Sequence, residues 1–150
     1  MFSNTAEYAL RAVMHLATSP EQARTAKEIA AAGKIPGGYV SKVLQDLATA
    51  GILDSRRGPS GGFRLAREPG AISVLDVINA VDPIERITKC PLGLPEQSKQ
   101  LCSLHRQLDD AIAHVERTLA EATFAQMLTG DRRSPKFQFP TIRGVETQRG

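Results

Sequence analysis

Cysteine is scarce in this chain, and long hydrophobic runs are missing. Its two cysteines, Cys90 and Cys102, are too few for the disulfide framework of a secreted protein. No apolar run approaches the length of a membrane span, and the N-terminus lacks the basic flank and apolar core of a signal peptide. At 150 residues the chain has about the length of one domain. These features predict a cytoplasmic protein without a membrane partner.

Net charge is small, but its distribution is uneven. Residues 24–67 hold eight basic and three acidic residues, whereas residues 68–128 hold five basic and nine acidic ones. Residues 129–150 hold five basic and two acidic residues, which accounts for the whole net charge of +3. A basic segment beside an acidic one indicates that one surface meets a polyanion, although scattered surface charge gives the same counts.

Apolar periodicity predicts three helices in the first third of the chain. Residues 5–18 carry apolar side chains at helical spacing. Thr25 and Glu28 form a capping box that opens a second helix, which we expect Gly33 to end. After a glycine-containing turn, the same stripe returns and continues to Ala50.

The second and third predicted helices have the layout of a helix-turn-helix. Opposite its apolar stripe, the third helix carries small and polar groups that suit phosphates and base edges: Gly38, Ser41, Lys42, Gln45 and Thr49. Helical hairpins are frequent in all-helical domains, so this pattern is weak by itself.

The next segment, "GILDSRRGPSGGFRLA", sharpens the prediction. It is typical of two strands joined by a glycine-rich turn, with Arg56 and Arg57 at the tip. A basic hairpin directly after a helix-turn-helix is a wing, which can reach phosphates or the minor groove while the helix enters the major groove. A plain surface hairpin is the alternative.

The C-terminal half contains two more predicted helices. Ser73 and Asp76 cap a short one, and a loop rich in proline and glycine follows. An apolar stripe then recurs from Ser103 to Leu128, predicting one helix of nearly seven turns. Because so long a helix cannot bury its length against so small a domain, we expect it to pair with a second chain. Residues 129–150 have no clear period and are predicted to be extended or disordered.

Four stretches resemble the bacterial winged-helix regulators of the IscR, NsrR and CymR type. They are "TAEYALRAVMHLA", "IPGGYVSKVLQDLATAGIL", "SRRGPSGGFRLA" and "ISVLDVINAVD", of which the wing stretch is the most specific. The resemblance implies a mainly α protein. It would comprise a winged helix-turn-helix DNA-binding domain at 1–82, a sensor loop and dimerisation helix at 83–128, and a basic tail at 129–150.

The resemblance also implies a homodimer that binds a palindromic operator in double-stranded DNA and regulates transcription, with repression as the expected mode. By similarity, the DNA-contacting residues are Tyr39, Ser41, Lys42, Gln45, Arg56, Arg57, Ser60 and Gly61. Thr25 and Lys27 join them because they stand at the start of the preceding helix, and helix N-termini attract anions such as phosphate. All of them lie inside the basic segment 24–67.

Sensor members of this family usually carry three cysteines in the loop before the long helix. Here Cys90 matches the first cysteine, Cys102 and His105 match the last cysteine and its histidine, and the middle cysteine is missing. Glu7 stands where some members place an acidic ligand from the partner chain. The resemblance therefore implies a [2Fe–2S] cluster on Cys90, Cys102, His105 and Glu7. Counting ligands in this sequence leaves Glu96 as another candidate for the fourth ligand.

The residues themselves leave several alternatives open. Cys102 and His105 share one helix face, so both can point at one metal, and zinc can use the same ligands as a cluster. The two thiols can instead sense oxidants, or be inert.

His15 and His114 are interpreted as ordinary helix-surface residues. A small electron-transfer protein is a competing function, but it needs no arginine-tipped hairpin. We find no phosphate-binding glycine loop and no nucleophile elbow, so no enzyme is predicted.

Overall fold

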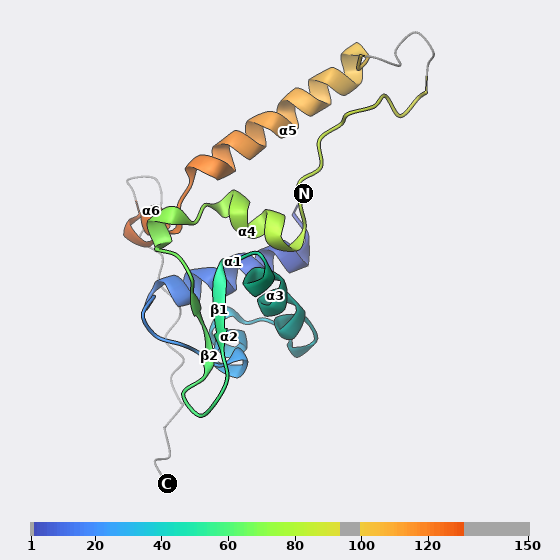
Figure 1. Ribbon diagram of the computed structural model, residues 1–150. Helices are drawn as coiled ribbons and strands as arrows, with labels where there is room; N and C mark the ends of the chain where they lie inside the picture. The colour runs from blue at the N-terminus through green and yellow to red at the C-terminus, as the bar shows by residue number, and fades with distance from the viewer. Residues whose placement is uncertain (1, 94–99, 131–150) are drawn as a thin grey trace.

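The computed structural model describes residues 2–93 and 100–130, and residues 1, 94–99 and 131–150 lie outside this description. The described part is mainly helical, with one two-stranded antiparallel sheet (Figure 1). Its elements are α1 (Asn4–Ala17), α2 (Ala26–Gly33), α3 (Gly37–Thr49), β1 (Leu53–Arg56), β2 (Gly62–Leu65), η1 (Pro69–Ala71), α4 (Val74–Val81), α5 (Ser103–Glu121) and α6 (Phe124–Thr129). This is the predicted fold class.

Side-chain caps explain where the helices begin. The predicted capping boxes of Thr25 with Glu28 and of Ser73 with Asp76 are both present, at the starts of α2 and α4. α2 ends at Gly33, as predicted, but the cap differs from the usual glycine cap. Gly33 is itself helical, and Lys34 takes the left-handed conformation with a φ of 50°. Gly33 is closely packed, because a Cβ there would lie 3.1 Å from the Ile35 side chain.

Helix α1 runs through the centre of the core. It contributes a row of fully buried alanines, including Ala9 and Ala12, and these small side chains let the neighbouring helices approach closely. Leu44 and Leu47 of α3 and Ile29 of α2 are also fully buried in the same cluster. The helix-turn-helix is therefore fixed to a rigid body by its apolar face, which leaves its polar face outward.

A short bridge to the segment before α2 anchors the hairpin. β1 and β2 pair from Leu53 with Leu65 to Arg56 with Gly62. Arg24 and Phe63 exchange both backbone hydrogen bonds at 2.8 Å. Gly62, at a φ of 139°, makes this approach possible, because a Cβ there would lie 2.4 Å from the Arg24 carbonyl oxygen. The hairpin thus has a fixed position relative to α2.

The prediction of one helix from Ser103 to Leu128 is wrong. α5 ends at Glu121, and Ala122 is extended. The Ala122 carbonyl accepts a hydrogen bond from the Val74 N–H at 2.9 Å, and the Phe124 N–H donates to the Ile72 carbonyl at 3.1 Å. These two bonds tie the chain to the start of α4, and a new capping box at Thr123 opens α6.

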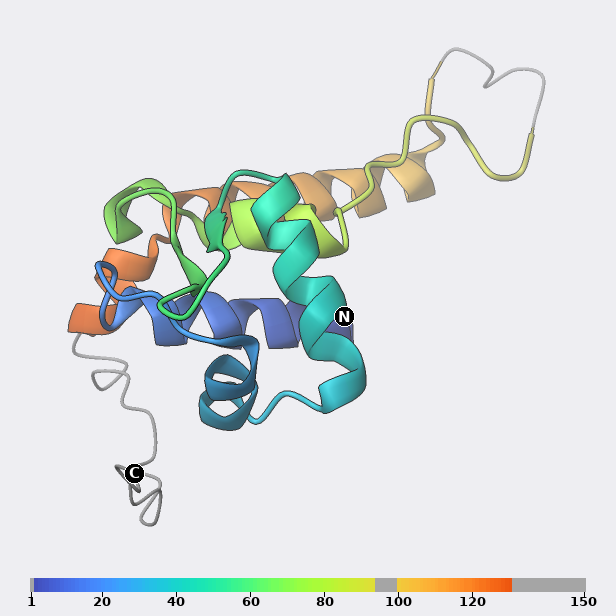
Figure 2. The same cartoon turned by 60° about the horizontal axis from the view of Figure 1, so that its bottom comes forward.

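Helix α6 belongs to the body and α5 largely does not. α6 packs on α1 and buries Phe124 to 1% exposure. α5 contacts α4 through its C-terminal half, where Leu119 packs with Val74 and Ile78. Its N-terminal half projects away from the body and carries the cysteine loop at its far end (Figures 1 and 2). In the described ranges, no helix combines the length and the apolar character needed to cross a bilayer.

Candidate nucleic-acid interface and metal centre

The polar face of α3 is exposed. Ser41, Lys42 and Gln45 lie outward, opposite the buried Val43, Leu44 and Leu47. Pro36, at the N-cap, makes no side-chain cap, so no N-cap side chain competes with an anion for the first N–H groups of α3, although the Tyr39 N–H donates to the Pro36 carbonyl. Three of the predicted contact residues are therefore accessible on one face of one helix.

Tyr39 stands in the first turn of α3 and is 41% exposed. Its ring meets that of Tyr8 edge to face, with 5.0 Å between centroids. The Arg11 guanidinium lies 5.7 Å from the centre of the Tyr8 ring. These contacts hold Tyr39 against α1 while its outer side remains open.

Two predicted contact residues already have intramolecular partners. The Lys42 ammonium lies 2.6 Å from the Asp46 carboxylate, one helical turn further along α3. The Thr25 hydroxyl accepts from the Glu28 N–H at 3.2 Å as part of the capping box. Lys27 is exposed. A DNA phosphate that binds at the start of α2 must therefore lie beside the Glu28 carboxylate. A phosphate that binds Lys42 on α3 has to displace the Asp46 carboxylate from the ammonium.

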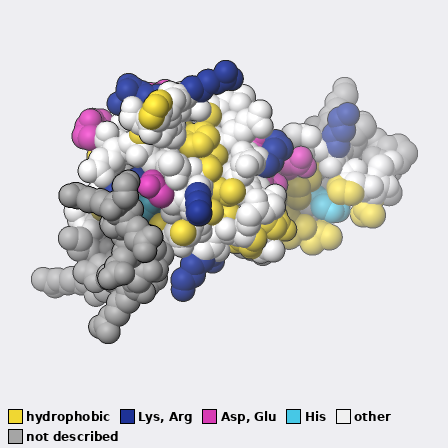
Figure 3. All heavy atoms as spheres, turned by 90° about the horizontal axis from the view of Figure 1, so that it is seen from below, with side chains coloured by type: hydrophobic (Ala, Val, Ile, Leu, Met, Phe, Trp, Pro, Cys, Tyr) yellow, Lys and Arg dark blue, Asp and Glu magenta, His cyan; other side chains and the backbone are white. Residues whose placement is uncertain are grey.

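The hairpin tip is exposed and tightly turned. Arg56, Arg57 and Ser60 are exposed, and Gly61 is half-buried. A Cβ on Gly61 would lie 2.4 Å from the Arg56 carbonyl oxygen, so this position tolerates only glycine without rearrangement. The face toward which the tip and α2 point carries Lys and Arg side chains at its rim and near its centre, with some Asp and Glu side chains between them (Figure 3).

The side chains of Cys90, Cys102 and His105 converge at the free end of α5. The two sulfurs are 3.9 Å apart, and the His105 Nδ1 lies 3.6 Å from the Cys90 Sγ and 3.0 Å from the Cys102 Sγ. In the described part of the chain, these three residues are the one group of metal-ligand type found this close together. The pattern of one loop cysteine with a cysteine and histidine on a helix is thus brought together as the spacing suggests.

Cys102 occupies a special position, because it is the N-cap of α5. Its sulfur accepts a hydrogen bond from the His105 N–H at 3.5 Å. The pKa of the Cys102 thiol is lowered from 9.0 to about 7. The hydrogen bond from the His105 N–H is the largest cause, and the hydrogen bond with the His105 side chain is the second largest. A thiol with such a pKa is substantially thiolate at neutral pH, which is the form that binds metals and reacts with oxidants.

An ion pair that the sequence does not reveal joins the segment before Cys90 to helix α5. The Arg86 Nε and Nη2 donate to the two Asp109 carboxylate oxygens at 2.7 and 2.6 Å. The Ile87 N–H also donates to Asp109, at 2.9 Å. We call this set the Arg86–Asp109 clamp. It lowers the pKa of Asp109 from 3.8 to about 2, chiefly through the hydrogen bond from Arg86. The partners are 23 residues apart, so no local spacing signals the pair.

The remaining candidate ligands lie elsewhere. Glu7 is exposed on α1 and pairs with Arg11 at 3.0 Å. Glu96 falls outside the described residues. His114 is exposed as expected, but His15 is half-buried at the end of α1, which corrects its assignment to the surface. Burial lowers the pKa of His15.

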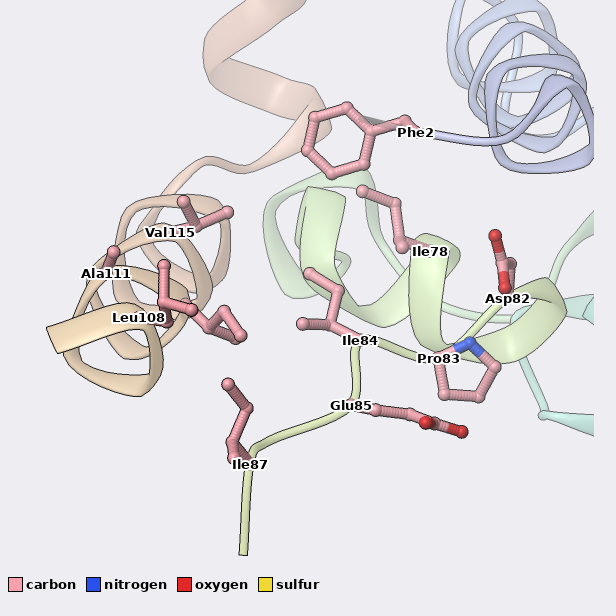
Figure 4. Close-up of a pocket in the computed structure, with 11 residues that line it drawn as sticks. Phe2, Ile78, Asp82, Pro83, Ile84, Glu85, Ile87, Leu108, Ala111 and Val115 are labelled. Carbon is pink, nitrogen blue, oxygen red and sulfur yellow. The ribbon is translucent and has the colours of Figure 1, made fainter. Parts of the chain in front are cut away.

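An apolar groove of about 690 Å³ separates α4 and the segment after it from α5. Ile84 and Ile87 point across it toward Leu108 and Val115 of α5, with Phe2 at one side (Figure 4). Leu108 is 47% exposed and Phe2 is 44% exposed. The groove continues the exposed apolar stripe of α5.

Comparisons with known proteins agree with these features. A protein-family model described as "Rrf2: Iron-dependent Transcriptional regulator" matches residues 2–130. The regulator NsrR of Geobacillus kaustophilus is 30% identical over 145 residues, covering 95% of this chain and 98% of the relative. The structure of IscR from T. potens superposes with a TM-score of 0.72 and 24% identity, covering 92% of this chain and 93% of that one. CymR, the global cysteine regulator of B. subtilis, gives a TM-score of 0.68 and 24% identity, with coverages of 83% and 93%. The two structures confirm the winged-helix fold.

Proposed function

The chain belongs to the Rrf2 family of transcriptional regulators, and on that premise we propose that it acts as a metal-responsive homodimer on a palindromic operator. Proteins of this family bind DNA and regulate transcription, and they are not enzymes. The proposal adds the operator symmetry, the dimer, the contacting residues and the sensing centre. Repression is the expected mode, and the bacterial cytoplasm, where the DNA is, is the expected location.

The exposed cations on α3 and on the wing support the DNA interface more than any other observation. Lys42, Arg56 and Arg57 are all exposed, and α3 and the hairpin are both held to one core by α1. A helix that fits the major groove and a basic tip beside it match the two contact points of a winged helix. Gln45 and Ser41 are the groups suited to base edges, while Tyr39, Thr25, Lys27, Ser60 and Gly61 lie around them.

The surface of α5 supports the homodimer. None of its 19 residues is fully buried, although its stripe is apolar. Leu104 is 60% exposed and Leu108 47% exposed. A second copy of α5 would cover this stripe and fill the groove beside it, and a two-fold dimer would present two recognition helices to two half-sites.

The Cys90, Cys102 and His105 group supports the sensing role. A [2Fe–2S] cluster is the occupant that the resemblance implies, with Glu7 of the partner subunit as the fourth ligand. Thiolate and imidazole are suitable donors for iron, and a bound cluster would supply a redox-active group at the end of α5. The donor types fit. The spacing does not, because each of the two irons takes two protein ligands and the three atoms lie too close together to be divided in that way.

A thiol pair is a second candidate for sensing, favoured by the 3.9 Å between the sulfurs. Oxidation by a peroxide would remove both thiol hydrogens, join the sulfurs and release two waters. Peroxide treatment of metal-free protein would then lower its mass by two hydrogens. An unchanged mass, or irreversible addition of oxygen, would argue against this candidate.

The DNA-binding proposal is tested at the wing. Replacing Arg56 and Arg57 by alanine should weaken binding to operator DNA and reduce the slope of log affinity against log salt by about one for each lost phosphate contact. Fluorescence anisotropy across a salt series measures both quantities. The matched control removes two exposed cations outside the proposed interface, Arg67 and Arg117. Equal effects of the two double substitutions would contradict the wing assignment.

A further inference from the structure

The three donor atoms at the end of α5 are spaced as ligands of one ion. A tetrahedral ion with Zn–S bonds near 2.3 Å and Zn–N bonds near 2.05 Å sets its ligands about 3.8 Å apart for two sulfurs and about 3.6 Å apart for sulfur and nitrogen. The observed separations are 3.9 Å for the sulfurs and 3.6 Å for Cys90 and His105. Only Cys102 and His105, now 3.0 Å apart, have to separate, by about half an ångström.

The same spacing argues against a two-iron group. Each iron of a [2Fe–2S] cluster takes its own pair of protein ligands, so ligands on different irons lie further apart than ligands on one iron. All three atoms here lie within 4.8 Å of one another. To host the cluster, Cys90 would have to move away from Cys102 and His105.

The Arg86–Asp109 clamp opposes that movement. Arg86 lies four residues before Cys90, and Asp109 lies one helical turn after His105. Two side-chain hydrogen bonds and one from the Ile87 N–H fix the loop arm to α5 at this point. Bidentate pairs of this kind define geometry as well as adding energy. The clamp therefore holds Cys90 beside the other two donors.

From these distances and the clamp we infer that Cys90, Cys102 and His105 form a three-ligand site for a single thiophilic divalent cation, with zinc the best match, and that Arg86 and Asp109 position it. Two thiolates and one imidazole prefer zinc and similar ions to magnesium or calcium. The role of this site in the cell rests on the proposed sensing function, but the existence of the site does not. The site itself requires no second chain, because three ligands already come from one.

Cobalt(II) is the probe, because it takes zinc's place and absorbs visible light when tetrahedral. Full-length protein, reduced and stripped of metal under anaerobic conditions, should bind one cobalt per chain and show thiolate-to-cobalt absorption that zinc then abolishes. Cys90→Ser and Cys102→Ser should each remove most of the thiolate signal. His105→Ala should weaken cobalt binding at least 10-fold, whereas His114→Ala, on the same helix, should leave it unchanged.

The positioning role has its own matched pair. Asp109→Asn should lower cobalt affinity by about 10-fold, the lower end of the range for residues that orient metal ligands. Glu121→Gln removes a carboxylate charge in the same way at an exposed residue at the other end of α5 and should have no effect. Circular dichroism checks that both variants keep their helices. Equal cobalt affinities for the two variants, with both folded, would overturn the role of the clamp.

Metal analysis and DNA binding separate this inference from the proposed function. Two irons and two sulfides per chain after anaerobic reconstitution, without stoichiometric cobalt or zinc binding to stripped protein, would overturn the single-ion site and leave a cluster sensor in place. One ion per chain, with identical DNA affinity in stripped and loaded protein, would uphold the site and overturn the sensing role.

Discussion

At the scale of single residues, Lys42 and Gln45 are expected to contribute differently to DNA binding. They lie on the same exposed face of α3, but an ammonium contacts phosphate regardless of sequence, whereas a glutamine amide pairs with one base. Lys42→Ala should weaken all DNA sequences about equally. Gln45→Ala should cost about 1–3 kcal/mol of discrimination at one position in each half-site. Binding to a library of single-base operator variants measures both effects.

The ion pair of Lys42 with Asp46 adds a control for this prediction. DNA has to compete with the Asp46 carboxylate, which lies 2.6 Å from the ammonium. Asp46→Asn should therefore strengthen binding to all sequences, because it frees Lys42 and removes a negative charge from the interface. If Asp46→Asn leaves DNA affinity unchanged, this face of α3 does not approach phosphate.

Asp109 gives a residue-scale prediction in pH. Its pKa is lowered in the folded protein from 3.8 to about 2, so the folded state favours the ionised carboxylate. The clamp then adds stability above pH 3.8, and this contribution is lost as pH falls toward 2. The stability difference between wild type and Asp109→Asn in urea unfolding of metal-free protein should be constant near neutrality and shrink in that acid range. A difference that stays constant down to pH 2 would mean that Arg86 does not hold the carboxylate.

At the scale of elements, the predictable parts of the fold have local causes. Capping boxes at Thr25 and Ser73 fix the starts of two helices from residues only three positions apart, and the glycine-rich turn does the same for the wing. The convergence of Cys90 with Cys102 and His105 was also within reach, since family resemblance and helical spacing both suggest it. The Arg86–Asp109 clamp could not be predicted, because a contact between residues 23 positions apart produces no periodic pattern in the sequence.

The break between α5 and α6 shows a different limit of sequence reasoning. The apolar stripe passes through Ala122 without interruption, so periodicity predicts a continuous helix. Tertiary bonds to Ile72 and Val74 turn the chain at this point, and they outweigh helix continuation because α6 then buries Phe124 against the core. Burying a phenylalanine contributes about 1.5–3 kcal/mol, which exceeds the preference of one residue for a helix.

The cap at Thr123 can be tested by substitution. Its hydroxyl accepts from the Gln126 N–H and opens α6, so Thr123→Ala should lower the free energy of unfolding by about 1 kcal/mol. Thr118→Ala is the control, because Thr118 lies exposed inside α5, where alanine is a better helix former. Urea unfolding followed by circular dichroism measures both. Equal stabilities of the two variants would show that α6 does not depend on its cap.

At the scale of the whole molecule, the proposed dimer would make DNA binding depend on the exposed stripe of α5. The body offers one recognition helix and one wing, so a palindromic site needs two bodies at a fixed separation. α5 projects from the body (Figure 2). Its apolar side is uncovered, and the candidate metal centre lies at its free end. A second α5 packed along this stripe would place each centre next to the other subunit. In this arrangement, metal binding at the centre can shift the packing of the two α5 helices and so change the distance between the two bodies.

A charge introduced into the stripe tests this link. Ala111 is exposed and lies on the stripe beside the apolar groove, so Ala111→Glu should leave the isolated chain folded but bury an unpaired carboxylate from each subunit in the dimer. A total cost of about 3 kcal/mol for the two carboxylates corresponds to a dimer dissociation constant raised by about 160-fold. Ala120→Glu makes the same change on the same helix, at an exposed residue off the stripe, and should leave the dimer intact. Sedimentation equilibrium measures dissociation, and anisotropy with operator DNA should show Ala111→Glu losing affinity in parallel, because a monomer engages only one half-site. A dimer that survives Ala111→Glu would mean that the two chains pair through another surface.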